Sequence, residues 1–63
     1  MLLNDILKLE GTIITVEKFN EIIQSQFIIF SQNCGISGLK IGYNWYIFTL
    51  TDGMEVNVYC KSL

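Results

Sequence analysis

Residues 45–60 read WYIFTLTDGMEVNVYC and decide the fold, because two β-rich runs flank a strong turn signal. The first run is aromatic and β-branched, and the second run alternates between apolar and polar residues. Between them, Asp52-Gly53 is a preferred dipeptide for a two-residue type I′ turn. The C-terminal third of the chain is therefore predicted to be a β-hairpin.

A two-residue turn would fix the register of this hairpin and, with it, the composition of its two faces. The predicted core face pairs Trp45 with Cys60, Ile47 with Val58 and Thr49 with Val56. The opposite face carries Tyr46, Phe48, Leu50, Glu55, Asn57, Tyr59 and Lys61. A sheet face that meets water is normally polar, and the aromatic centre of this second face therefore indicates a surface that a partner covers.

The turn that precedes the hairpin decides whether two more apolar residues join this second face. If the Tyr43-Asn44 turn has two residues, Leu39 and Ile41 lie on the second face. If the loop has three residues, they lie on the core face instead. We take the first alternative. The predicted partner or oligomer interface then consists of Leu39, Ile41, Tyr46, Phe48, Leu50 and Tyr59.

Two short helices are predicted in the N-terminal part of the chain. The first spans residues 2–10 and ends at Gly11, and residues 12–15 follow as an extended segment because they are all β-branched. The second spans residues 16–25, with Thr15 as its N-cap and apolar residues at helical spacing.

The apolar run at residues 27–30 fits either a continued helix or a buried strand, and two adjacent isoleucines favour the strand. A turn at residues 33–35 and a strand at residues 39–41 are then expected. The predicted fold is α+β: two N-terminal helices packed on an antiparallel meander of three or four strands, with residues 1–63 as one small domain.

Composition indicates that this domain associates. A chain of 63 residues buries only about 60% of the surface that its unfolded form exposes, so small domains often need an additional stabilising link. Hydrophobic residues make up 51% of the chain, and Lys40 is the only charged residue between Ile22 and Thr51. A stretch with so little charge is expected to pass through a core and an interface, which predicts a homodimer or a complex with another protein.

Most other classes of function lack the residues that they need. The chain has no His and two cysteines, Cys34 and Cys60, so neither a zinc site nor an imidazole base is expected. Free thiols are favoured over a disulfide, because nothing else indicates an oxidising compartment. Four widely spaced lysines without arginine disfavour nucleic-acid binding. Polar residues and glycines interrupt the nearly uncharged stretch from Ile22 to Thr51, so a membrane helix is not expected there.

These observations predict a non-catalytic protein–protein interaction module with no cofactor, metal or small-molecule substrate. The high Ile and Asn content without Arg, Pro or His resembles the product of an AT-rich gene, and we expect a cytoplasmic inhibitor or adaptor from a bacterium or a phage. It would act by occluding or trapping a partner protein. The alternative is a structural homo-oligomer whose main partner is itself.

Overall fold

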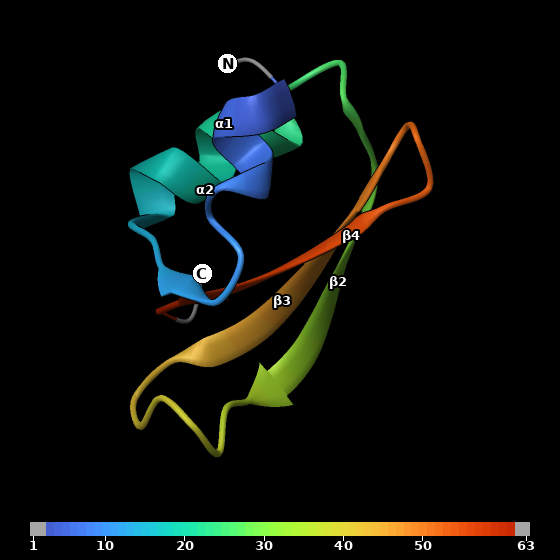
Figure 1. Ribbon diagram of the computed structural model, residues 1–63. Coiled ribbons are helices and arrows are strands. Elements are labelled where there is room, and N and C mark those ends of the chain that lie inside the picture. Colours follow the sequence, from blue (N-terminus) through green and yellow to red (C-terminus); the bar gives the residue numbers. More distant parts are fainter. Residues whose placement is uncertain (1–2, 62–63) are drawn as a thin grey trace.

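The computed structural model describes residues 3–61, which form two short helices and a four-stranded sheet (Figure 1). The elements are α1 (Leu3–Leu7), β1 (Thr12–Ile13), α2 (Val16–Ile23), β2 (Ile28–Ile36), β3 (Asn44–Leu50) and β4 (Glu55–Cys60). The predicted α+β class is confirmed. Helix α1 is shorter than expected, and Leu2, its predicted first residue, lies outside the described residues.

The sheet has the order β1-β4-β3-β2, and β2, β3 and β4 form an antiparallel meander. The prediction of a purely antiparallel sheet is wrong, because β1 pairs in parallel with β4. Backbone bonds extend this pairing: Gly11 N–H donates to the Asn57 carbonyl at 2.7 Å, and Ile14 N–H donates to the Tyr59 carbonyl at 2.8 Å. The extended segment at residues 12–15 therefore closes one edge of the sheet.

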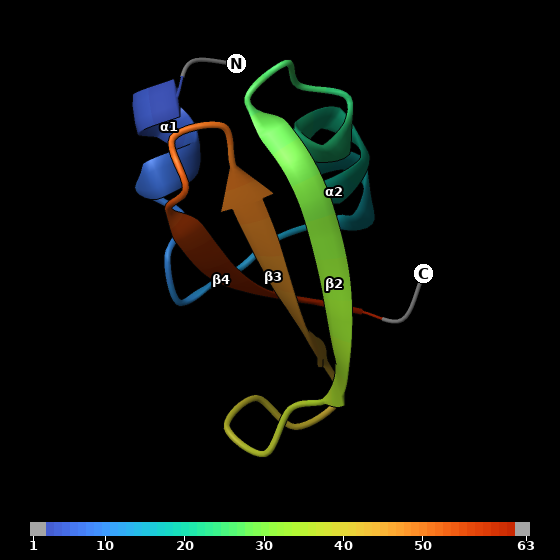
Figure 2. The same cartoon turned by 90° about the vertical axis from the view of Figure 1, so that its right-hand side faces the viewer.

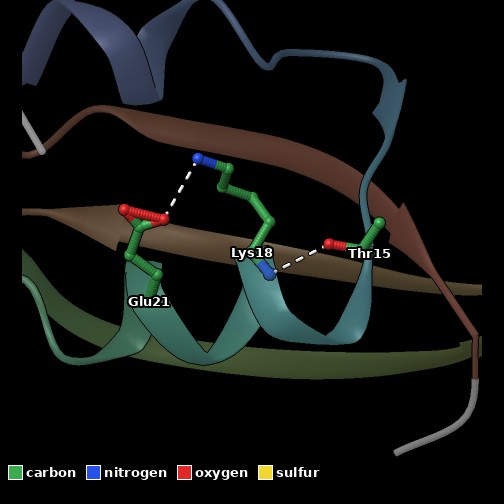
Figure 3. Close-up of polar contacts among 3 residues, drawn as sticks. All are labelled: Thr15, Lys18 and Glu21. Atoms are coloured by element: carbon green, nitrogen blue, oxygen red, sulfur yellow. Dashed lines mark hydrogen bonds and ion pairs between the residues drawn. The ribbon is translucent and has the colours of Figure 1, made fainter.

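Helix α2 begins where the sequence predicts (Figure 3). The Thr15 hydroxyl accepts a hydrogen bond from the Lys18 backbone N–H at 3.0 Å, which satisfies one of the free donors of the first turn. The Lys18 ammonium lies 3.1 Å from the Glu21 carboxylate, and both side chains are exposed enough that this ion pair contributes about 0.5 kcal/mol or less. The opposite face of the helix buries Phe19 and Ile22.

Strand β2 confirms the strand chosen for residues 28–30, whereas Phe27 lies in the turn before it, and β2 runs further than expected. The predicted turn at residues 33–35 is wrong, because these residues lie within β2 as an irregularity in its pairing with β3. The predicted strand at residues 39–41 is also wrong, because residues 37–43 form the loop that joins β2 to β3. This loop lies at the end of the sheet opposite the β3–β4 turn (Figures 1 and 2).

The β3–β4 hairpin exists, but its turn is one residue longer than predicted. Leu50 N–H donates to the Met54 carbonyl at 2.8 Å, and Gly53 N–H donates to the Leu50 carbonyl at 2.9 Å. These bonds enclose a three-residue loop in which Gly53 has φ of 88°, the geometry of a type I turn followed by a left-handed glycine. Asp52 supports the loop, because its carboxylate accepts the Met54 N–H at 2.9 Å.

The extra residue shifts the strand pairing by one and exchanges the two faces of β3. Phe48 pairs with Val56 and Tyr46 pairs with Val58, instead of the predicted partners. Helices α1 and α2 lie on one side of the sheet (Figure 1), and the buried cluster joins Ile6, Ile14, Phe19 and Ile22 to Tyr46, Phe48, Leu50, Val56, Val58 and Cys60. The ring of Phe19 lies 4.7 Å from that of Tyr46 and 5.2 Å from that of Phe48. The core assignment is therefore right for Val56, Val58 and Cys60.

Substitution of Gly53 tests the longer turn. Gly53→Ala places a Cβ on a residue with φ of 88°, which is expected to destabilise the fold by about 1–2 kcal/mol. For a domain of this size, each kcal/mol lowers the melting temperature by about 4–8 °C, measured by circular dichroism. Gly38→Ala is the matched control, because Gly38 has no positive φ and no atom within 4 Å of the added Cβ. Equal melting temperatures of the two variants would contradict the assigned turn.

Candidate interaction surface

The exposed apolar side chains are concentrated between residues 29 and 45. Over the described residues, the large hydrophobic side chains that remain exposed are Ile13, Val16, Ile23, Ile29, Phe30, Ile36, Leu39, Ile41, Trp45 and Met54. Six of these ten come from β2, the loop 37–43 and the start of β3. Leu39 and Ile41 are 82% and 92% exposed, the values of side chains that contact almost nothing within the chain.

The loop that presents Leu39 and Ile41 is held in place by the polar groups of its own residues. Ser37 is buried, and its hydroxyl accepts the backbone N–H groups of Leu39 at 3.1 Å and Lys40 at 3.0 Å. Ser37 N–H donates to the Tyr43 carbonyl at 2.9 Å, and Tyr43 N–H donates to the Lys40 carbonyl at 3.1 Å. These four bonds give the loop one defined shape, so that less conformational entropy remains to be lost when a partner binds.

Beside the loop is a hollow of about 180 Å³, lined by Ser37, Gly38, Leu39, Trp45 and Tyr59. Trp45 and Tyr59 are directly paired across β3 and β4, on the sheet face opposite the core. The Lys40 ammonium lies 5.9 Å from the centre of the Tyr59 ring, a cation–π distance, and Tyr59 is 9% exposed. The loop therefore covers Tyr59 and leaves Trp45 at the rim, 38% exposed.

A chain of hydrogen bonds fixes the orientation of Trp45. Its indole Nε1–H donates to Asn57 Oδ1 at 2.8 Å. Asn57 in turn donates its backbone N–H to Glu10 Oε1 at 3.0 Å and its side-chain amide to Glu10 Oε2 at 3.2 Å. The indole ring is thus held in one orientation by bonds from β4 and from the segment before β1.

The hollow beside Trp45, at about 180 Å³, is large enough for one side chain and smaller than the usual pockets for drug-sized ligands. Drug-sized ligands occupy pockets of about 300–1,000 Å³, whereas a dry cavity of about 150 Å³ holds one benzene ring. A larger hollow of about 340 Å³ lies beside the start of α2. Of the residues that line it, Glu17 and Lys61 are charged. The hollow beside Leu39 and Trp45 therefore has room for about one side chain.

The two cysteines of the described structure differ in exposure. Both are free; Cys34 is half-buried in β2, and Cys60 is fully buried in the core. Burial raises the pKa of the Cys60 thiol, and a hydrogen bond with the Lys61 backbone only partly offsets this effect. Residues 3–61 contain no group of three His, Cys, Asp or Glu side chains placed to hold a metal ion, and none of their helices is long and apolar enough to cross a membrane.

The structure divides the predicted interface residues between three places. Tyr46, Phe48 and Leu50 are 4%, 0% and 0% exposed and form the core under the helices, so their predicted position on an open face is wrong. Tyr59, predicted beside Tyr46, lies on the opposite face beneath the loop. Leu39 and Ile41 are exposed, although neither belongs to a strand. Their role at an interface stays a prediction.

Between residues 29 and 45, four exposed apolar residues were not predicted as interface residues: Ile29, Phe30, Ile36 and Trp45. Trp45 was placed in the core, and the same one-residue shift that buries Tyr46 exposes it. The dipeptide Asp52-Gly53 also fits a three-residue loop with Gly at its last position, so the signal for the correct face was present but ambiguous.

Comparisons with known proteins identify no relative of this chain. No protein-family model matches the sequence, and no curated protein or solved structure shows significant similarity to it. The function must therefore be inferred from the side chains themselves.

Thiol labelling at pH 8 tests the placement of the two cysteines. Cys34 is expected to react readily, whereas Cys60 should react only as the protein unfolds, because it is buried and its raised pKa leaves less thiolate. The variants Cys34→Ser and Cys60→Ala isolate each thiol, and denaturant should accelerate only the reaction of Cys60. Rapid labelling of Cys60 in the native protein would show an accessible, activated thiol and would contradict its position in the core.

Proposed function

We propose that this chain is a non-catalytic protein–protein interaction module that acts as an inhibitor or adaptor by covering the surface of a partner protein. The proposed binding surface, the loop surface, consists of the exposed Leu39, Ile41 and Trp45 and the hollow at whose base Tyr59 lies. It replaces the predicted interface at Tyr46, Phe48 and Leu50, which lies in the core. A cytoplasmic location and a bacterial or phage origin belong to the same proposal.

The observation that carries this proposal is the exposure of Leu39 and Ile41 on an ordered loop. Burying one such side chain stabilises a complex by about 1.5–3 kcal/mol. In the isolated chain, this free energy is not gained because the side chain stays in contact with water. Trp45 adds a large aromatic surface with a fixed orientation, the kind of side chain that is enriched at binding hot spots.

The electrostatics of the loop surface indicate the chemistry of its partner. Lys40 is the only charged side chain between Ile22 and Thr51, and its ammonium lies over Tyr59. The partner is therefore expected to offer an apolar patch with one protruding side chain for the hollow and few positive charges around it. Specificity would come from the shape of the hollow, with little contribution from charge pairing.

A structural homo-oligomer is the alternative function, and one separate observation favours it. Strand β2 forms an edge of the sheet and carries exposed apolar side chains, among them Ile29 and Phe30. The presence of another bound protein separates the two functions: a structural oligomer has no protein partner other than itself, whereas an inhibitor or adaptor binds another protein whether or not it self-associates.

A double substitution tests the loop surface. A photo-crosslinking amino acid at Ile41, introduced in the source cell, is expected to yield a discrete adduct that identifies the partner. With the purified partner, Leu39→Ser combined with Ile41→Ser should then weaken binding about 100-fold or more in calorimetry, because two exposed apolar contacts are lost.

The matched control places the same changes elsewhere on the apolar surface. Ile13→Ser with Ile23→Ser also removes two exposed apolar side chains, outside the loop surface, and should leave the partner affinity unchanged. Circular dichroism should show that both double variants remain folded. Equal affinity of the loop variant and the parent protein would exclude the loop surface as the binding site.

A further inference from the structure

The outer edge of β2 offers backbone hydrogen-bonding groups that no strand uses. In the described sheet, β2 has β3 on one side and no strand on the other (Figure 2). Native proteins commonly protect such an edge with charged residues, proline or β-bulges. Residues 28–36 contain two bulges but no charged residue and no proline, and no charged residue occurs between Glu21 and Lys40. This edge therefore accepts another strand without electrostatic cost.

The hydrogen bonds beside the β3–β4 turn show which residues of β2 direct their backbone groups toward this open edge. Leu50 bonds to Met54 across the hairpin, so alternate residues of β3 direct their backbone groups toward β4, and Ile47 and Thr49 direct theirs toward β2. Gln32 pairs with Ile47, so its backbone groups point inward to β3. By the same alternation, the N–H and C=O groups of Ser31 and Asn33 point outward.

Two bulges lie on either side of residues 31–33 of β2, and a two-fold rotation about Gln32 exchanges their positions. One irregularity lies between Ile28 and Phe30, and the other lies between Asn33 and Ile36. An antiparallel partner strand centred on Gln32 pairs residues whose numbers sum to 64, which places the first bulge of one copy opposite the second bulge of the other. An unrelated straight strand would lose its register at both bulges.

We propose that β2 pairs antiparallel with β2 of a second copy of this chain, about a two-fold axis at Gln32, so that the two sheets become one. Ser31 of each copy exchanges backbone hydrogen bonds with Asn33 of the other. Beyond the bulges, Ile28 of one copy lies opposite Ile36 of the other, which is 86% exposed in the single chain. Every side chain in the contact is uncharged, so two identical copies do not repel each other.

The surface available sets the strength of this dimer. A standard interface buries about 800 Å² on each partner, which would be about a fifth of the 4074 Å² that this chain exposes. The proposed contact is confined to the nine residues of β2, so the dimer is expected to be reversible. It goes beyond the proposed function and does not depend on it, because Leu39, Ile41 and Trp45 lie outside the paired strand.

Disulfide trapping tests both the dimer and its register. In the proposed pairing, Gln32 faces Gln32 of the second copy as a non-hydrogen-bonded pair, with Cα atoms about 4.5 Å apart. This distance is within the range of about 4.4–6.8 Å that a disulfide spans. In a Cys34→Ser background, Gln32→Cys should therefore form a covalent dimer under mild oxidation of the pure protein, at a rate at least about tenfold above that of Asn20→Cys on the exposed face of α2.

A charge substitution tests the same edge without covalent chemistry. Ser31→Lys brings like charges together across the two-fold axis, and it should weaken dimerisation about tenfold or more in analytical ultracentrifugation. Asn20→Lys adds the same charge on α2 and should leave dimerisation unchanged. Circular dichroism of both variants establishes that the monomer is folded.

The outcomes separate this inference from the proposed function. A parent protein that stays monomeric up to millimolar concentration, or equal trapping of Gln32→Cys and Asn20→Cys, would overturn the dimer and leave partner binding by the loop surface standing. Binding of β2 to a strand of another protein, with no self-association, would also overturn it. If Leu39→Ser with Ile41→Ser abolishes self-association, the copies meet through the loop surface, which contradicts the assigned edge.

Discussion

The rest of the structure depends on two backbone hydrogen bonds at the β3–β4 turn. Leu50 N–H donates to the Met54 carbonyl, and Gly53 N–H donates to the Leu50 carbonyl. These bonds set a three-residue loop, and the loop sets which residues of β3 and β4 are opposite each other. Because side chains alternate along a strand, this one choice places Phe48 under the helices and Trp45 on the other face. The core, the hollow beside Trp45 and the outward groups of β2 all follow from it.

Local sequence patterns predicted the elements better than their pairing. Thr15, the helix it caps and the extended run at residues 28–30 were predictable, because capping and β-branching act over a few residues. The parallel pairing of β1 with β4 was not, since it joins Thr12 to Val58 across most of the chain. The turn chemistry at Gly53 permits two loop lengths whose registers differ by one residue, and packing against Phe19 fixes the choice.

The candidate site shows the same division. An excess of apolar surface was predictable from composition and from the charge-free middle of the chain. Its location was not, because Tyr46 and Trp45 are adjacent in sequence and exchange places with a one-residue shift. Leu39 and Ile41 were predicted as interface residues on a strand, and they are exposed on a loop that Ser37 organises. A sheet covered by helices on one side thus leaves a face, a loop and an edge for association, and the proposed partner and the proposed second copy use different parts of them.

The register of the hairpin is the central claim, and cross-strand nuclear Overhauser effects test it most directly. The structure pairs Ile47 with Asn57 and Trp45 with Tyr59, and both are non-hydrogen-bonded pairs in which the Cα atoms approach to about 4.5 Å. Strong Hα–Hα effects are therefore expected between Ile47 and Asn57 and between Trp45 and Tyr59. Strong effects that instead link Phe48 to Asn57 and Tyr46 to Tyr59, the non-hydrogen-bonded pairs of a two-residue turn, would contradict this register, and they would return Trp45 to the core.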